Sequence, residues 1–157
     1  MKNGLIVCAV LLAATACGSS DSPSTPSIAS VAGNWAGSMS YTFKNNAGTP
    51  VQGIDASFSM SLTQSGTSVS GTWKSPLSDG TTRSGTVGGT LTTTSFSGAF
   101  TYHRTLTDGT NCDGTLTVSG PAGGNSLTWT SPGVIENCGN PDTNITITVV
   151  KLSLIHI

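Results

Sequence analysis

The feature that most constrains this chain is a two-residue rhythm of large apolar side chains between residues 31 and 151. In the run from Ile54 to Leu62, apolar residues occupy the even positions, while Asp55 and a series of hydroxyl residues occupy the odd positions. Such alternation is typical of a strand that covers a core with one face and meets solvent with the other. We therefore expect Ile54 to face inward and Asp55 outward. No segment shows a 3.6-residue apolar rhythm, so we expect almost no helix.

Eight such runs follow one another, separated by short connections rich in Gly, Asn, Asp and Pro, as at Ser65-Gly66. Short links between successive strands favour a meander of antiparallel hairpins. Eight strands can close into a barrel that leaves no free edge. The sequence predicts an all-β fold, a single eight-stranded antiparallel up-and-down barrel, with a β-sandwich as the alternative. The runs span residues 35–43, 54–62, 69–73, 87–91, 96–102, 116–118, 127–129 and 145–149.

Composition narrows the class of protein. Charged residues make up 8% of the chain, whereas ordinary soluble domains have about 25%. Ser, Thr and Gly take their place, which is typical of a secreted β protein. The formal net charge of −1 gives no basic surface for nucleic acid or for anionic lipid, and we expect no nucleic-acid partner.

The first seventeen residues have the pattern of a signal peptide. An apolar stretch, Leu5–Ala14, is too short to span a bilayer permanently. The residues Ala13-Ala14-Thr15-Ala16-Cys17 that follow resemble the lipobox of bacterial lipoproteins, which implies cleavage before Cys17 and acylation of its thiol. The resemblance also implies a membrane partner and a place in the cell envelope, and Gly18 favours the outer membrane, on its periplasmic or surface face. A plain secretory signal with an incidental cysteine is the alternative.

The other end carries a second segment that we set aside. Leu152–Ile157 resembles the translation of a transposase adapter used in preparing sequencing libraries, and the apolar phase slips there from odd to even positions. A bulge in a genuine strand is the alternative. The expected organisation has four parts: a signal peptide at 1–17, a Ser/Pro-rich tether at 18–30, a β-barrel domain at 31–151 and an artefactual tail at 152–157.

One motif resembles a known family. Gly33-Asn34-Trp35, at the start of the first run, resembles the Gly-x-Trp of lipocalin-type barrels. This resemblance implies that Trp35 closes one barrel end beneath a basic residue after the last strand, a role open to Lys151. The chain departs from the family after Thr107-Asp108, where the usual Tyr is missing. The phrases Val69-Ser-Gly-Thr-Trp73 and Ser84-Gly-Thr86 resemble those of uncharacterised bacterial lipoproteins, which imply no particular activity.

Cys112 and Cys138 are the cysteines of the expected domain. In an oxidising compartment such a pair indicates a disulfide. Two thiolates make a poor metal site, because structural zinc usually takes four protein ligands. We therefore expect a disulfide rather than a metal site or redox catalysis, and no cofactor.

The sequence gives little support for catalysis. His103 shares the outward parity of Thr101, and no Gly-x-Ser-x-Gly elbow is present for a nucleophilic serine. An acid pair for glycoside hydrolysis remains an alternative, yet every acidic residue of the domain except Asp55 is expected in a turn, where it serves backbone geometry. We expect the protein not to be an enzyme. The acidic residues concerned are Asp55, Asp79, Asp108, Asp113, Glu136 and Asp142.

Eight aromatic residues are expected to face inward. They either fill a core or line a cavity for a small apolar ligand. The leading hypothesis is a lipid-anchored, non-enzymatic binding or structural barrel in the envelope. One alternative is a surface module for glycan or protein partners, and another is a small integral outer-membrane barrel. The candidate lining residues are Trp35, Tyr41, Phe58, Trp73, Phe96, Phe100, Tyr102 and Trp129.

Overall fold

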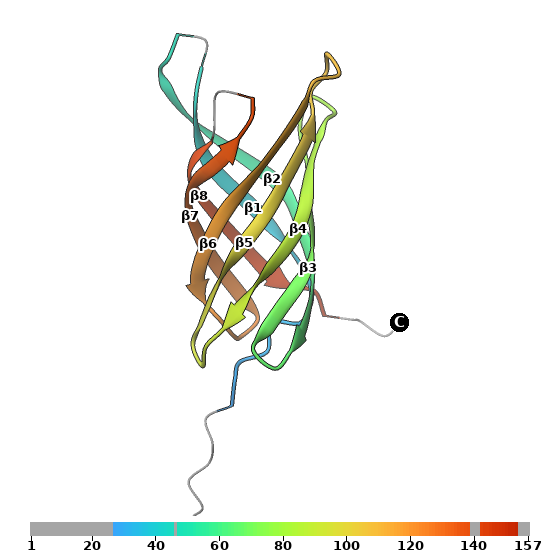
Figure 1. Ribbon diagram of the computed structural model, residues 1–157, viewed down its shortest axis with the longest axis vertical. Coiled ribbons are helices and arrows are strands. Elements are labelled where there is room, and N and C mark those ends of the chain that lie inside the picture. The colour runs from blue at the N-terminus through green and yellow to red at the C-terminus, as the bar shows by residue number, and fades with distance from the viewer. Residues whose placement is uncertain (1–26, 46, 139–141, 154–157) are drawn as a thin grey trace, which may run out of the picture.

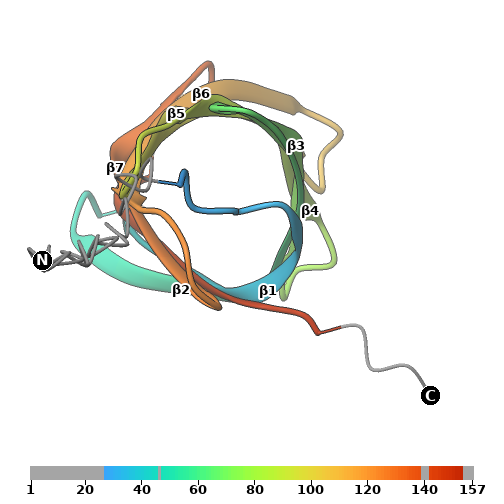
Figure 2. The ribbon, with the colours of Figure 1, turned by 90° about the horizontal axis from the view of Figure 1, so that it is seen from below.

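The computed structural model of this 157-residue chain describes residues 27–45, 47–138 and 142–153. Eight antiparallel strands form a closed barrel in which each strand pairs with the next and β8 pairs back with β1 (Figures 1 and 2). The all-β prediction and its closed barrel are confirmed, and the sandwich alternative is wrong. The strands are β1 (Gly33–Lys44), β2 (Pro50–Ser65), β3 (Ser68–Pro76), β4 (Thr82–Leu91), β5 (Ser95–Thr105), β6 (Asn111–Pro121), β7 (Ser126–Glu136) and β8 (Thr143–Lys151).

The described residues contain no helix, and so none that could cross a membrane. Large apolar side chains point into the barrel and Ser and Thr side chains cover much of its outside, as the alternation predicts. Thr63 and Thr72 are examples of the exposed hydroxyl face. An integral outer-membrane barrel needs the reverse, with its apolar side chains facing lipid. The described strands have the opposite distribution of side chains.

Aromatic rings fill the middle of the barrel. Phe96 stacks on Trp129 with 4.2 Å between ring centroids, and Phe100 meets the same indole edge-on at 6.1 Å. Phe58 stacks on Trp73 at 5.6 Å. These distances lie in the range of favourable aromatic pairs. Ring contacts connect six of the eight candidate lining residues, and all eight except the half-buried Tyr41 are almost fully enclosed. The six are Phe58, Trp73, Phe96, Phe100, Tyr102 and Trp129.

Glycines on the inward face make room for these rings. A Cβ atom on Gly89 or on Gly98 would lie 2.6 Å from ring carbons of Phe96. Real Cβ atoms do not approach other carbons so closely, and therefore a side chain at either position would displace the ring. The space that these two glycines leave is occupied by Phe96.

One end of the barrel is closed by the chain that precedes β1, which crosses the opening in Figure 2. Val31 is fully buried there, and its carbonyl accepts a hydrogen bond of 2.9 Å from the Trp35 indole. The amide of Val31 donates to the Gln64 side chain, which in turn donates to the carbonyl of Ala29. The Lys151 ammonium lies 5.5 Å from the centroid of the Trp35 ring. Trp35 therefore lies at the closed end of the barrel with the Lys151 ammonium beside its ring, which is the arrangement that the Gly-x-Trp resemblance implies.

The opposite end, called here the mouth, carries the β1–β2, β3–β4, β5–β6 and β7–β8 connections (Figure 1). A β-bulge in β2 changes the side-chain phase on the way to it. Gly37 pairs with Phe58 and Met39 with Asp55, so β2 has one more residue than β1 between these pairs. A single extra residue exchanges the two faces of a strand. Asp55 is consequently buried, with 4% of its surface exposed, and Ile54 is 68% exposed. The outward prediction for Asp55 and the inward prediction for Ile54 are therefore wrong.

The barrel wall parts between β2 and β3 near the mouth. Their pairing ends at Ser59 and Lys74. The β1–β2 pairing continues to Pro50, and the β3–β4 pairing continues to Pro76. The two hairpins therefore diverge, and side chains rather than backbone hydrogen bonds connect β2 to β3 there.

A disulfide joins Cys112 in β6 to Cys138 after β7, as predicted. The two cysteines are 26 residues apart in sequence. In the chain-entropy description, closing a loop of this length stabilises the fold by about 3–4 kcal/mol. The bond fastens the β7–β8 connection to the barrel wall beside the mouth.

Candidate functional site

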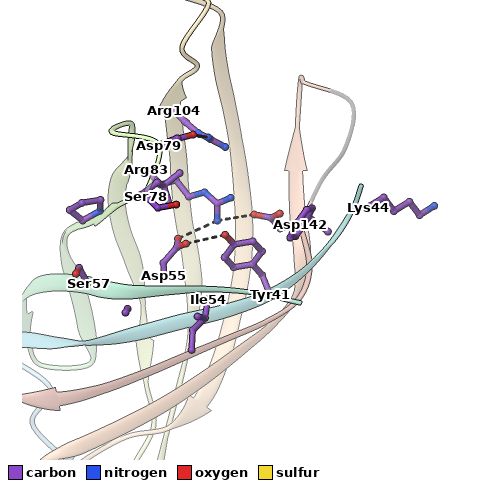
Figure 3. A pocket seen from close by; sticks show the side chains of 14 residues that line it. Tyr41, Lys44, Ile54, Asp55, Ser57, Ser78, Asp79, Arg83, Arg104 and Asp142 are labelled. Atoms are coloured by element: carbon purple, nitrogen blue, oxygen red, sulfur yellow. Dashed lines mark hydrogen bonds and ion pairs between the residues drawn. The ribbon is translucent and has the colours of Figure 1, made fainter. Parts of the chain in front are cut away.

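Five side chains meet inside the mouth, and we call them the mouth cluster. Figure 3 shows all of them except Ser75. The Asp55 carboxylate is the hub. One of its oxygens accepts a hydrogen bond from the Tyr41 hydroxyl at 3.0 Å, and the other accepts from the Ser75 hydroxyl at 3.1 Å. A nitrogen of the Arg83 guanidinium lies 3.3 Å from Asp55 and 3.0 Å from Asp142. The cluster thus connects β1, β2, β3 and β4 to the residue before β8.

The strand rhythm itself places two members of the mouth cluster. Ser75 has the inward parity of Trp73, and Arg83 has the inward parity of Val87. Inward side chains are apolar toward the closed end and become polar toward the mouth. Asp55 joins them because of the bulge in β2. Asp142 joins them because the β7–β8 connection carries it over the opening.

Burial determines the electrostatics of the mouth cluster. Desolvation alone would lower the pKa of Arg83, but the carboxylates of Asp142 and Asp55 outweigh it and raise that pKa. Burial raises the pKa of Asp142 above its ordinary value, and Arg83 opposes this in part. Burial, with help from the neighbouring Asp55, raises the pKa of Tyr41 to about 12. At neutral pH Arg83 is therefore charged. The Tyr41 hydroxyl keeps its proton and donates a hydrogen bond to Asp55.

One hydrogen-bond donor of Arg83, its Nε–H group, is not used within the mouth cluster. Its guanidinium lies over the Tyr41 ring, 4.3 Å from the centroid, which is a favourable cation–π geometry. The Nε atom is buried and has no hydrogen-bond acceptor among the described residues. A buried donor without an acceptor costs about 1–3 kcal/mol. Such groups are rare in folded proteins, and each needs an explanation, such as strain, a catalytic role or a bound water or ion.

Beside the mouth cluster lies a cleft of about 640 Å³, called here the mouth cleft (Figure 3). It occupies the gap where β2 diverges from β3. Its walls come from β2 at 54–57 and from the β3–β4 connection at 76–79, with Arg83 and Asp142 toward the barrel. Small-molecule sites usually have volumes of about 300–1,000 Å³ and combine apolar walls with a few converging polar groups. The mouth cleft has a volume in this range, and both polar and apolar side chains line it.

An ion pair at the rim completes the lining. Arg104 donates to Asp79 at 2.6 Å and to the Thr81 hydroxyl at 3.2 Å. Hydrogen bonds from Thr81, together with the charge of Arg104, hold the pKa of the Asp79 carboxyl below its ordinary value. Asp79 also accepts from the backbone amide of Thr81, as does Asp108 from the amide of Thr110. The predicted turn role is confirmed for these two aspartates.

Three other acidic residues differ from the prediction. Glu136 is the last residue of β7 rather than part of a turn. Asp113 lies within β6 rather than in a turn, and its carboxylate contacts exposed His103 at 2.6 Å. The outward orientation predicted for His103 is confirmed. Asp142 directly precedes β8 but is buried in the mouth cluster rather than serving a surface turn. Cys17 and His156 lie outside the described residues.

Comparison of the chain with protein-family models, with curated proteins and with solved structures finds no match. Function is therefore inferred from the geometry of the mouth. Within residues 27–45, 47–138 and 142–153, no three His, Cys, Asp or Glu side chains are grouped so that they could hold a metal ion.

Three carboxyl groups at the mouth end, those of Asp142, Asp79 and Asp108, should titrate on different sides of the ordinary Asp value of 3.8. In a ¹³C NMR titration we expect the Asp142 midpoint above that value and those of Asp79 and Asp108 below it. Because Asp142 holds its proton more tightly when folded, its contribution to stability falls as pH rises through its folded pKa. The contributions of Asp79 and Asp108 are instead lost as pH falls through theirs. An Asp142 midpoint below 3.8 would contradict the burial described here.

Proposed function

We propose that this barrel is a non-enzymatic binding module that takes a small polar molecule in the mouth cleft. The observation that carries the proposal is a buried guanidinium, Arg83, held between Asp55 and Asp142 beside a cleft of suitable size. Its Nε donor lacks an acceptor among the described residues. The barrel interior is a poorer candidate for an apolar ligand, because its aromatic rings stack on one another.

Binding fits the mouth cluster better than hydrolysis does. A pair of carboxyl groups that cleaves glycosides needs one group free to give a proton and another free to attack or to activate water. Both oxygens of Asp55 are occupied, by Tyr41 on one side and by Ser75 and Arg83 on the other. Groups engaged in this way position a ligand rather than exchange protons with it.

A bulky substitution at the cleft tests the proposal. Ser78 is an exposed residue of the cleft wall, and Ser78→Trp should fill the space without disturbing the core. The matched control is Thr93→Trp, in an exposed turn at the closed end. The full chain would be titrated with D-glucose, glycine betaine, succinate and spermidine while ¹H–¹⁵N NMR shifts are followed. We expect at least one compound to shift the amides of Ser57, Ser78 and Arg83, an effect that Ser78→Trp abolishes and Thr93→Trp keeps. No shift at the cleft with any of the four would overturn the proposal.

We further propose that the barrel is held in the cell envelope by acyl chains on Cys17. The chain enters the barrel at the closed end, where Val31 and Trp35 seal the opening. An anchor attached before residue 27 would therefore leave the mouth facing away from the membrane. Several acyl chains give lasting residence in a membrane, whereas a single chain is marginal.

Metabolic labelling tests the anchor. The chain, expressed in a bacterium supplied with an alkyne fatty acid, should incorporate the label. Cys17→Ser should abolish labelling, because it removes the thiol that the lipobox presents. Cys8→Ser is the matched control, since Cys8 lies in the apolar stretch of the signal, and it should leave labelling unchanged. Equal labelling of Cys17→Ser and the parent chain would refute the anchor.

A further inference from the structure

We infer, resting on the binding role proposed above, that the molecule in the mouth cleft is a neutral, hydroxyl-rich one, that is, a saccharide. The inference depends on how the charges of the cleft are paired, on the hydrogen-bonding groups it offers and on its apolar wall.

The charges that line the mouth cleft cancel. Three cationic and three acidic side chains contribute to it, and most of them are engaged with each other. Arg83 binds Asp55 and Asp142, and Arg104 binds Asp79. An anion approaching Arg83 would meet two carboxylates, and a cation approaching those carboxylates would meet the guanidinium. The remaining cation, Lys44, is exposed, and its side chain points away from the mouth cluster (Figure 3). A ligand with net charge would therefore lose its hydration without gaining a free counter-charge in the mouth cluster.

Hydrogen-bonding groups of both kinds nevertheless line the cleft. The hydroxyls of Ser57 and Ser78 each donate and accept, and both side chains are exposed in the cleft wall. Asp142 uses one carboxylate oxygen for Arg83. The Nε donor of Arg83 has no acceptor in the described part of the chain, but it is buried behind the cleft surface. Hydroxyl and carboxylate groups that line one cleft match a ligand with several hydroxyl groups, each of which donates one hydrogen bond and accepts others.

Part of the lining is apolar. Phe43, Ile54 and Leu77 contribute to it, and Ile54 is 68% exposed because the bulge turns it outward. A sugar ring presents hydroxyls at its edge and C–H groups on its faces. It can therefore place a face against these side chains while its hydroxyls reach Ser57, Ser78 and the mouth cluster.

Charge-matched sugars separate this inference from the binding role on which it rests. The full chain would be titrated by ¹H–¹⁵N NMR with the neutral sugars D-glucose, N-acetyl-D-glucosamine and maltose. The charged counterparts are D-glucosamine, which is cationic, and D-glucuronate, which is anionic. We expect at least one neutral sugar to shift the amides around Ser57, Ser78 and Arg83, and the charged sugars to bind at least about tenfold more weakly, a difference of about 1.4 kcal/mol. Ser78→Trp should remove these shifts, and Thr93→Trp should leave them within about twofold.

Each other outcome counts against the inference. If D-glucosamine or D-glucuronate binds more tightly than every neutral sugar, the ligand class is wrong and the binding role stands. If no sugar shifts the cleft but succinate, spermidine or glycine betaine does, the same conclusion holds. If none of these compounds shifts the cleft, the inference and the binding role both fail. Sugar-induced shifts that persist in Ser78→Trp would place the site elsewhere on the barrel.

Discussion

Replacing Trp129 with alanine should lower the free energy of unfolding by about 3–5 kcal/mol, the range for removing a large aromatic side chain from a core. Trp129 is fully buried, stacks on Phe96 and meets Phe100 edge-on. Its indole nitrogen also donates to the carbonyl of Pro121 at 3.0 Å. The variant would lose these ring contacts and leave a cavity at the centre of the barrel.

Chemical denaturation of the full chain measures this loss. Ile135→Ala provides the control on the same strand, because Ile135 is 84% exposed. Its change should stay within about 1 kcal/mol, the span of strand propensities. A Trp129→Ala variant as stable as Ile135→Ala would mean that the ring lies outside the core.

Replacing Asp55 with alanine should also cost about 3–5 kcal/mol, because it leaves a buried charge without one of its partners. The change removes the acceptor of Tyr41 and Ser75, and leaves Arg83 with Asp142 as its remaining ion-pair partner in the described structure. The same denaturation measurement applies. Asp113→Ala is the matched control, since Asp113 forms an exposed ion pair with His103, and such pairs contribute about 0–1 kcal/mol. Equal losses from the two variants would contradict the buried position of Asp55.

Most of the fold could be predicted from local pattern. Except beyond the bulge in β2, alternation marks the inward side of the strands, as at Trp73 and Phe100, because the side chains of a strand point to its two faces in turn. Closure could not be predicted in the same way, since it depends on β8 meeting β1 across the whole chain. The Cys112–Cys138 disulfide was predictable from cysteine number and compartment alone.

Only some residues of the mouth cluster could be predicted from the sequence. Ser75 and Arg83 continue the inward parity of their strands, so a polar end to the interior could have been inferred from them. Asp55 could not, because the bulge that turns it inward arises from the register between β1 and β2. Asp142 resembles an ordinary turn residue, and its burial depends on how the β7–β8 connection crosses the mouth. The lipobox at Cys17 stays a prediction.

The mouth cluster depends above all on the bulge in β2, which turns Asp55 inward so that it contacts Arg83. A double-mutant cycle with Asp55→Asn, Arg83→Met and the combined variant, followed by chemical denaturation, tests this contact most directly. Removing both partners of a buried ion pair costs less than the sum of the single changes. We expect the double variant to be more stable than additivity predicts by at least about 1 kcal/mol. Losses that add to within about 0.5 kcal/mol would show that the two side chains do not touch, as they would if Asp55 faced solvent.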